Sequence, residues 1–151
     1  MASPQTHRIR VFIDSSVLYA AALSATGPAR ELILRGIRGE CDLVISPLVL
    51  EETERNLEDK APHALGPFGA FRDVLGARQV DPSKASIKRV AAIVNLKDAP
   101  IVAAAVRGRV DFLATHDVKT LLRYKDGVKR DLGVTLVQPQ EVLVLLRGEQ
   151  A

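Results

Sequence analysis

The chain has 151 residues, of which 47% are hydrophobic and 26% are charged, with a formal net charge of +3 and a sequence pI near 9.2. This length and balance predict one soluble domain covering residues 1–151, whose core is built from aliphatic side chains because aromatic residues make up only 4%. Cys41 is the single cysteine, which excludes a disulfide framework and a cysteine-based zinc site, and we expect it to be a small buried residue.

The first half of the chain alternates β-rich apolar runs with segments of helical periodicity. The expected elements are a strand at 9–13, helices at 17–23 and 29–38, a strand at 41–45, and a helix from 46 to about 57. Ser46 followed by Pro47 is typical of a helix start, because serine caps a helix and proline fits its first turn. Two prolines and two glycines in 61–69 predict a loop or a broken helical segment, before a helix at 71–75 and an edge strand at 79–81.

The second half continues the alternation of helices and strands. The expected elements are helices at 84–94 and 98–107, a strand at 111–114, a short helix from 117 through 122, a strand at 135–138, and a helix at 139–146. Strands that alternate with helices in this way predict an α/β fold in which a parallel sheet is covered on both faces.

Four acidic residues recur where predicted strands end and helices begin, namely Asp14, Glu52, Asp98 and Asp117. In an open α/β sheet the carboxyl ends of parallel strands form the ligand crevice, so these side chains are expected to converge. Converging carboxylates repel one another unless a hard cation holds them together, and oxygen ligands suit Mg²⁺ or Mn²⁺. We therefore predict metal-assisted phosphodiester hydrolysis, with Asp14, Asp98 and Asp117 as the metal ligands.

Each acid also has a structural interpretation. Asp14, Asp98 and Asp117 are all suited to capping the helix that follows, although one carboxylate oxygen can cap while the other faces a cation. Spacing alone does not identify which glutamate of the expected helix belongs to the site. Glu51 points away from the apolar face, and Glu52 and Glu54 lie on opposite flanks of that face.

Other polar residues near the acids are candidates for supporting roles. Ser16 and Thr115 can orient carboxylates or waters, or can serve as ordinary capping hydroxyls. His116 is expected to be a solvent-facing turn residue. The basic residues Arg30, Arg35, Arg107 and Lys119 are individually typical of a solvated surface, but together they can follow an RNA backbone. The sequence shows no aromatic ladder for base stacking, so RNA affinity would rest on charge.

Taken together, the four acidic segments resemble the motifs of the PIN-domain family. The similar segments are 11–18 (VFIDSSVL), 45–52 (ISPLVLEE), 98–105 (DAPIVAAA) and 111–117 (DFLATHD). The resemblance implies a three-layer α/β/α sandwich with a central parallel sheet of about five strands. It also implies a Mg²⁺- or Mn²⁺-dependent endoribonuclease, and it favours Glu52 as the fourth catalytic residue. Because many members are toxins of toxin–antitoxin pairs, an antitoxin protein is an expected partner.

The all-apolar segment 17–23 is either core or a subunit interface, and together with the resemblance it predicts a homodimer. No apolar run approaches the ~20 residues of a membrane span and no signal peptide is evident, so a cytoplasmic protein without membrane contact is expected. Two rival functions are a non-catalytic nucleic-acid-binding module and a phosphoacceptor receiver domain. A receiver domain needs paired acids after the first strand, whereas Ser16 and Asp14 leave a single acid there.

Overall fold

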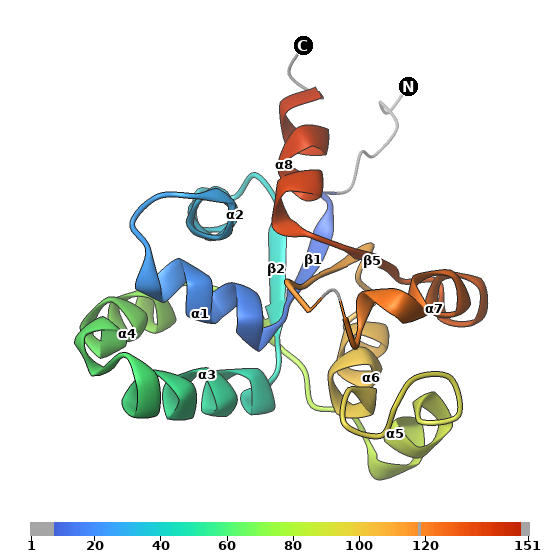
Figure 1. Cartoon of the computed structure of the whole chain (residues 1–151). Helices are drawn as coiled ribbons and strands as arrows, with labels where there is room; N and C mark the ends of the chain where they lie inside the picture. The colour runs from blue at the N-terminus through green and yellow to red at the C-terminus, as the bar shows by residue number, and fades with distance from the viewer. Residues whose placement is uncertain (1–7, 118, 149–151) are drawn as a thin grey trace.

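The computed structural model describes residues 8–117 and 119–148, which form a five-stranded parallel sheet with helices on both faces (Figure 1). The strands are β1 (Arg10–Ile13), β2 (Asp42–Ile45), β3 (Arg78–Gln79), β4 (Phe112–Ala114) and β5 (Thr135–Val137). Their order across the sheet is β3-β2-β1-β4-β5, so β1 is central and β3 and β5 are the edges. The predicted α/β class, the parallel sheet and the edge position of β3 are confirmed.

The sheet is held by apolar side chains on both of its faces. Phe12 of β1 lies opposite Val44 of β2 and Leu113 of β4, and all of these side chains are buried. A parallel sheet covered on two faces needs continuous apolar runs rather than alternating ones, which is why the strands read as short blocks of Val, Ile, Leu and Phe.

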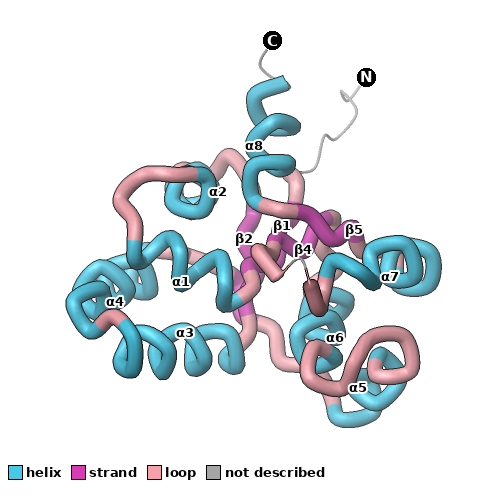
Figure 2. Tube along the Cα trace, in the orientation of Figure 1, coloured by secondary structure: helices cyan, strands magenta, loops and turns pink. Residues whose placement is uncertain are grey.

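Helices surround the sheet in two groups, α1 to α4 on one side of the strands and α5 to α7 on the other (Figures 1 and 2). The α-helices are α1 (Ser15–Leu23), α2 (Pro28–Ile37), α3 (Pro47–Lys60), α4 (Leu65–Val74), α5 (Lys84–Val90), α6 (Ala99–Arg107), α7 (Lys125–Leu132) and α8 (Pro139–Gly148). Short 3-10 turns occupy Pro62–Ala64 and Leu122–Tyr124, and α8 packs against α2.

The segment 61–69, for which the sequence predicts a loop or a broken helical segment, contains a 3-10 turn and the first half of α4. Pro67 lies in the first turn of α4, where its missing N–H is not needed by the helix. Phe68 and Phe71 are three positions apart on one face and are both buried, so packing outweighs the poor helix propensity of Gly66 and Gly69.

Helices α5 and α7 also differ from the prediction. Helix α5 ends at Val90 rather than continuing to Val94, and the chain continues in turns. Helix α7 was not predicted, because Val128 is its one buried residue and its charged face dominates the pattern. Its end is marked by Gly133, whose φ of 74° is the left-handed conformation that closes many helices.

Most of the apolar helix α1 belongs to the core, in agreement with one of the two interpretations of segment 17–23, while Leu23 at its end is exposed. Val17, Leu18, Ala21 and Ala22 are buried, and α2, α3 and α4 pack around them. Cys41 is also buried as expected, and burial raises the pKa of its thiol to about 11. Over the described ranges of the chain, no helix is both long enough and apolar enough to cross a membrane.

Candidate functional site

The four predicted acids lie around one cavity of about 410 Å³, which we call the carboxylate pocket. Its walls come from the carboxyl ends of β1 and β4 and from the first turns or faces of α1, α3 and α6. The lining residues are Asp14, Ser15, Ser16, Glu52, Arg55, Asn56, Lys97, Asp98, Ile101, His116 and Asp117. The sheet topology therefore gathers acids that are spread from position 14 to position 117 of the sequence.

Asp14 is the most firmly held of these acids. It follows β1 as the N-cap of α1 and is 8% exposed. Its Oδ1 accepts a 2.7 Å bond from the backbone N–H of Ser15, and its Oδ2 accepts bonds from the hydroxyls of Thr115 at 2.6 Å and Ser16 at 3.1 Å. Burial raises the pKa of Asp14, the three hydrogen bonds oppose this rise, and the nearby charge of Asp117 adds to it.

The hydroxyls around Asp14 form a connected network. Thr115 is fully buried and accepts a 3.0 Å bond from the backbone N–H of Asp117, while the Ser16 hydroxyl accepts a 2.9 Å bond from the backbone N–H of His116. These bonds tie the turn after β4 to the start of α1. The structure thus places Ser16 and Thr115 against Asp14, the position that their predicted supporting role requires.

Asp98 occupies the N-cap position of α6, yet its side chain makes no capping hydrogen bond. Its backbone N–H is satisfied by the side-chain oxygen of Asn95 at 2.8 Å. Within residues 8–117 and 119–148, the buried Oδ2 of Asp98 has no hydrogen-bond partner. The capping interpretation of Asp98 is therefore wrong, and a buried carboxylate oxygen of this kind needs an ion or a water as its partner.

Asp117 does form the local bonds that its capping interpretation predicts. The backbone N–H of Thr120 donates to its Oδ1 at 3.1 Å, and the Thr120 hydroxyl donates to its Oδ2. A short helix is expected from Asp117 through Leu122, and its position 118 lies outside the described residues. Residues 119–121 form a turn, and a 3-10 turn begins at Leu122. Asp117 lines the carboxylate pocket, and both of its carboxylate oxygens already accept hydrogen bonds from Thr120.

The structure separates Glu52 from the other glutamates of α3. Glu52 lines the carboxylate pocket, whereas Glu51 is exposed and pairs with Arg55, and Glu54 pairs with Arg72 at 3.2 Å. Burial raises the pKa of Glu52, with a further rise from the charge of Asp14. Position therefore supports the choice of Glu52, which spacing alone left open.

His116 differs from the prediction of a solvent-facing turn residue. Its side chain is half-buried and lines the carboxylate pocket. Burial lowers the pKa of His116 below its ordinary value, against a smaller opposing effect of the Asp14 charge. Burial in the pocket therefore favours the neutral form of the imidazole.

The sequence predicts Asp14, Asp98 and Asp117 as metal ligands, and the structure brings these three acids and Glu52 to one cavity. Within the described part of the chain, no three His, Cys, Asp or Glu side chains are arranged to hold a metal ion among themselves. Both carboxylate oxygens of Asp117 accept hydrogen bonds from Thr120. The oxygen-only donors and the unpartnered Oδ2 of Asp98 nevertheless fit Mg²⁺, which commonly binds one or two carboxylates and keeps several waters.

The predicted RNA-binding residues do not line the carboxylate pocket. Arg30 donates to the carbonyl of Ala21 and stacks 4.4 Å from the centre of the Phe71 ring, and Arg35 forms ion pairs with Glu31 and Glu40. Arg107 lies at the other end of α6, and Lys119 is exposed after the β4 turn. The positive charges in the pocket come instead from Arg55 and Lys97, whose only sequence signal is their proximity to Glu52 and Asp98.

Comparison with known proteins agrees with this geometry. A family model described as PIN domain matches residues 10–119, a segment that contains all four acids. The chain is similar to the solved structure of PAE2754 from Pyrobaculum aerophilum, with 20% identity over 93% of this chain and 96% of that chain and a TM-score of 0.65. No curated protein sequence matches the chain significantly.

Two further solved structures share the fold at low identity. VapBC2 from Rickettsia felis, bound to a DNA fragment from its promoter, matches with 14% identity over 85% of this chain and 97% of that chain, at a TM-score of 0.61. VapC20 from Mycobacterium tuberculosis, described as a sarcin-ricin loop cleaving toxin, matches with 17% identity over 72% of this chain and 91% of that chain, at a TM-score of 0.53.

Proposed function

The chain belongs to the PIN domain family, and on that premise we propose that it is a Mg²⁺- or Mn²⁺-dependent endoribonuclease acting at the carboxylate pocket. The observation that carries this proposal is the buried Oδ2 of Asp98, which lacks a hydrogen-bond partner in the described residues and shares the pocket with Asp14, Glu52 and Asp117. A divalent cation satisfies that oxygen and offsets the repulsion between the carboxylates.

Asp14 and Asp98 are the residues that would hold the cation, with Glu52 and Asp117 completing the negative charge of the site. Bound there, a divalent cation neutralises charge on the scissile phosphate and lowers the pKa of a water that it binds. The oxygen-only donor set of the four acids is the kind that Mg²⁺ and Mn²⁺ prefer.

The protein's own residues hold these carboxylates in position, raise the pKa of Glu52 and supply positive charge beside them. Thr115, Ser16 and the N–H of Ser15 hold both oxygens of Asp14 in place, so little reorganisation is needed when a substrate binds. Glu52 is partly exposed at the pocket and its pKa is raised, first by burial, which suits it to accept a proton from the attacking water. Arg55 and Lys97 add positive charge at the pocket wall for the phosphate of the substrate.

The cleavage assay that tests this proposal compares two charge-matched variants. Asp98→Asn removes the unpartnered carboxylate, whereas Asp126→Asn removes an exposed carboxylate from α7. We expect the wild type and Asp126→Asn to cleave RNA with Mg²⁺ or Mn²⁺ and to stop in EDTA, and Asp98→Asn to lose at least ~100-fold in rate. Cleavage that persists in EDTA, or an Asp98→Asn variant with full activity, would exclude the proposed mechanism.

We further propose that the protein is the toxin of a toxin–antitoxin pair. The structural similarity to VapC20, which is described as a toxin, and to VapBC2 supports this proposal. An antitoxin protein would then be its partner and would restrain cleavage. Induced expression of the wild type should stop the growth of a bacterial host and that of Asp98→Asn should not; equal growth arrest by both would argue against a nuclease toxin.

A homodimer is the proposed assembly, formed through apolar residues that α2 and α8 leave exposed. These residues are Leu34, Val144 and Leu145, and the two helices pack against each other, so their exposed side chains belong to neighbouring elements. Light scattering at micromolar concentration should give twice the chain mass for the wild type and less for Leu145→Glu. A monomeric wild type would contradict the homodimer.

A further inference from the structure

A second charged cavity lies at the opposite edge of the sheet from the carboxylate pocket. It has a volume of about 680 Å³ and contains four arginines, Arg10, Arg78, Arg107 and Arg109, with Asp81 as its one acid. Arg10 and Arg78 are the first residues of β1 and β3, and Arg107 and Arg109 flank the end of α6 shortly before β4. We call this cavity the basic pocket. Arg10 and Arg109 lie near the amino ends of β1 and β4, whereas Arg78 lies on the edge strand β3, opposite Val44 of β2.

Among the described residues, the arginines of the basic pocket differ from most other arginines in having no hydrogen-bond or ion-pair partner for their guanidinium groups. Arg8, Arg35, Arg38, Arg55, Arg72, Arg130 and Arg147 form ion pairs, while Arg30 and Arg123 contact a carbonyl or a tyrosine. Within the described ranges, the four guanidinium groups of the basic pocket make no hydrogen bond or ion pair. Unpaired like charges around one cavity repel, so an anion that binds them all is favoured.

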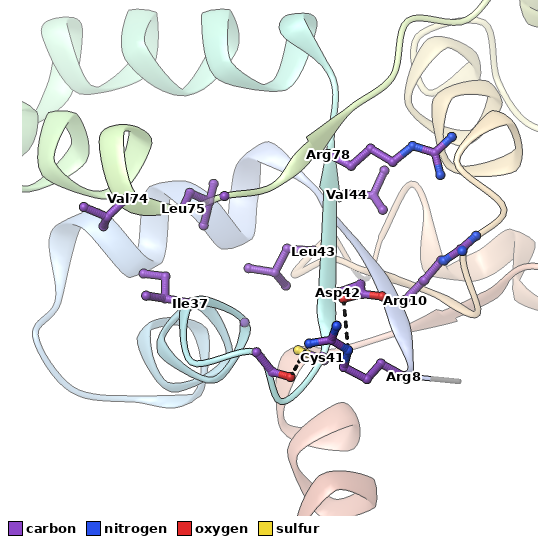
Figure 3. Close-up of a pocket in the computed structure, with 13 residues that line it drawn as sticks. Arg8, Arg10, Ile37, Cys41, Asp42, Leu43, Val44, Val74, Leu75 and Arg78 are labelled. Atoms are coloured by element: carbon purple, nitrogen blue, oxygen red, sulfur yellow. Dashed lines mark hydrogen bonds and ion pairs between the residues drawn. The ribbon is translucent and has the colours of Figure 1, made fainter. Parts of the chain in front are cut away.

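The basic pocket is one part of a longer concave track. Arg10 and Arg78 also line a neighbouring cavity of about 350 Å³, where Figure 3 shows both side chains extending in the same direction while Arg8 is held by Asp42. On its other side, Arg107 also lines the groove between α5 and α6, together with the exposed Arg89. This continuity favours an extended ligand over a small enclosed one.

We propose that the basic pocket binds the phosphate groups of an RNA strand, as a second contact surface on the substrate of the carboxylate pocket. Guanidinium groups recognise phosphate with paired hydrogen bonds, and the track has no aromatic side chain for stacking a base. Binding there is therefore directed to the backbone, independent of sequence, and strongly dependent on salt.

Two elements run between the basic pocket and the carboxylate pocket. In β1, Arg10 begins the strand and Asp14 follows its end, about 13 Å away at the usual rise of a strand. In α6, Asp98 precedes the helix and Arg107 ends it. An RNA strand that contacts both pockets therefore extends along the direction of the strands, from one end of β1 to the other. This inference rests on the proposed function only in identifying the strand as a substrate.

The test measures the binding of a labelled single-stranded RNA by fluorescence anisotropy in EDTA at low salt, where no metal-dependent cleavage occurs. The variant is Arg78→Gln with Arg107→Gln, both of which are exposed, and the control is Lys60→Gln with Lys129→Gln, which removes the same charge from exposed positions of α3 and α7. We expect about tenfold weaker binding for the arginine variant and a salt slope lower by about 1.4, with little change in the control. The double variant Arg78→Lys with Arg107→Lys should bind the RNA with intermediate affinity, because lysine keeps the positive charge but lacks the paired N–H donors of the guanidinium group.

The outcomes separate this inference from the proposed function. Equal affinity of the arginine variant and the lysine control would overturn the basic pocket as an RNA site, whatever the wild type cleaves. Incubating the same RNA with Mn²⁺ tests cleavage independently. If the wild type binds RNA through the arginines but does not cleave it, the proposed nuclease activity is contradicted and the RNA site in the basic pocket is not. Thermal melting of each variant checks that its fold is retained.

Discussion

Thr115, at the end of β4, donates a 2.6 Å hydrogen bond to Oδ2 of Asp14, at the end of β1. The two residues meet because β1 and β4 are parallel neighbours in which Ile13 lies opposite Ala114, and the next residue of each strand extends past the sheet. The backbone N–H of Asp14 also bonds to the carbonyl of Ala114 at 3.1 Å. The orientation of Asp14 is therefore fixed by strand register, and the hydroxyl of Thr115 is part of the candidate site.

Thr115→Val should weaken the candidate site while leaving a side chain of nearly the same size and shape. The Thr115 hydrogen bond lowers the pKa of Asp14, so its loss should move the acid limb of the pH–rate profile to higher pH. We expect cleavage to fall by about 10- to 100-fold and stability by about 1–3 kcal/mol, because the N–H of Asp117 also loses an acceptor. Thr115→Ser keeps the hydroxyl and should restore the acid limb; if it behaves as Thr115→Val does, the hydrogen bond is not the cause.

Asp14→Asn should abolish cleavage and stabilise the metal-free protein at neutral pH. Burial raises the pKa of Asp14 above its ordinary value of 3.8, so the folded state holds the proton more tightly than the unfolded state does. That stabilisation is present below pH ~3.8 and is lost as the pH rises through the folded-state pKa. In EDTA at pH 7 the variant should melt about 2–4 °C above the wild type, and the difference should vanish near pH 3.5. A lower melting temperature at pH 7 would favour a purely structural capping role.

Glu52→Gln and Glu51→Gln form a matched pair on α3. Glu52 lines the carboxylate pocket, whereas Glu51 is exposed and pairs with Arg55. We expect Glu52→Gln to lower kcat for RNA cleavage by about 100-fold, and Glu51→Gln to stay within about twofold of the wild type. Similar losses of kcat in both variants would show that cleavage depends on the negative charge of α3 and does not require the Glu52 carboxylate in particular.

Arg109→Gly should make the protein more stable while weakening RNA binding. Arg109 has a φ of 53°, in the left-handed region that costs a side-chain-bearing residue about 1 kcal/mol. Gly108 precedes it because a Cβ there would lie 2.8 Å from Cγ1 of Val44. The melting temperature should rise by about 2–3 °C in Arg109→Gly and should fall in Arg107→Gly, where glycine enters the end of α6.

Both of these glycine variants remove one guanidinium group from the basic pocket. Both should therefore bind RNA more weakly in EDTA, although their stabilities change in opposite directions. RNA affinity that instead follows melting temperature would indicate an effect of folding rather than of charge.

Much of the fold and the acidic site follows from local signals in the sequence. The apolar run that ends at Asp14 gives the central strand, and Ser46 caps α3 through a 3.3 Å bond to the N–H of Val49. Asp14 and Asp117 follow the parallel neighbours β1 and β4, so their approach was predictable from the sequence. The expected position at a strand end is wrong for Asp98, which comes after α5 and begins α6, and for Glu52, which lies within α3, so these two acids reach the pocket by helix packing.

Features that depend on tertiary packing were not predictable in the same way. Residues Glu52 and Glu54 are equivalent on a helical wheel, and the neighbours of α3 decide which one faces the pocket. The basic pocket depends on strand order and register, which bring Arg10 of the central strand and Arg78 of the edge strand β3 to one cavity although they are far apart in the sequence. Helix α7 escaped prediction because a single buried residue gives almost no periodic signal.

The most direct test of a cation site in the carboxylate pocket is calorimetric titration of Mn²⁺ into the wild type and into Asp98→Asn. We expect saturable Mn²⁺ binding to the wild type. Binding should be suppressed in Asp98→Asn, because the substitution removes the buried carboxylate whose Oδ2 has no hydrogen-bond partner among the described residues. We also expect that binding weakens as the pH falls, since protonation competes at Asp14, whose pKa is raised. Equal Mn²⁺ affinity in both proteins, or no binding by a wild type that still cleaves RNA, would contradict this cation site.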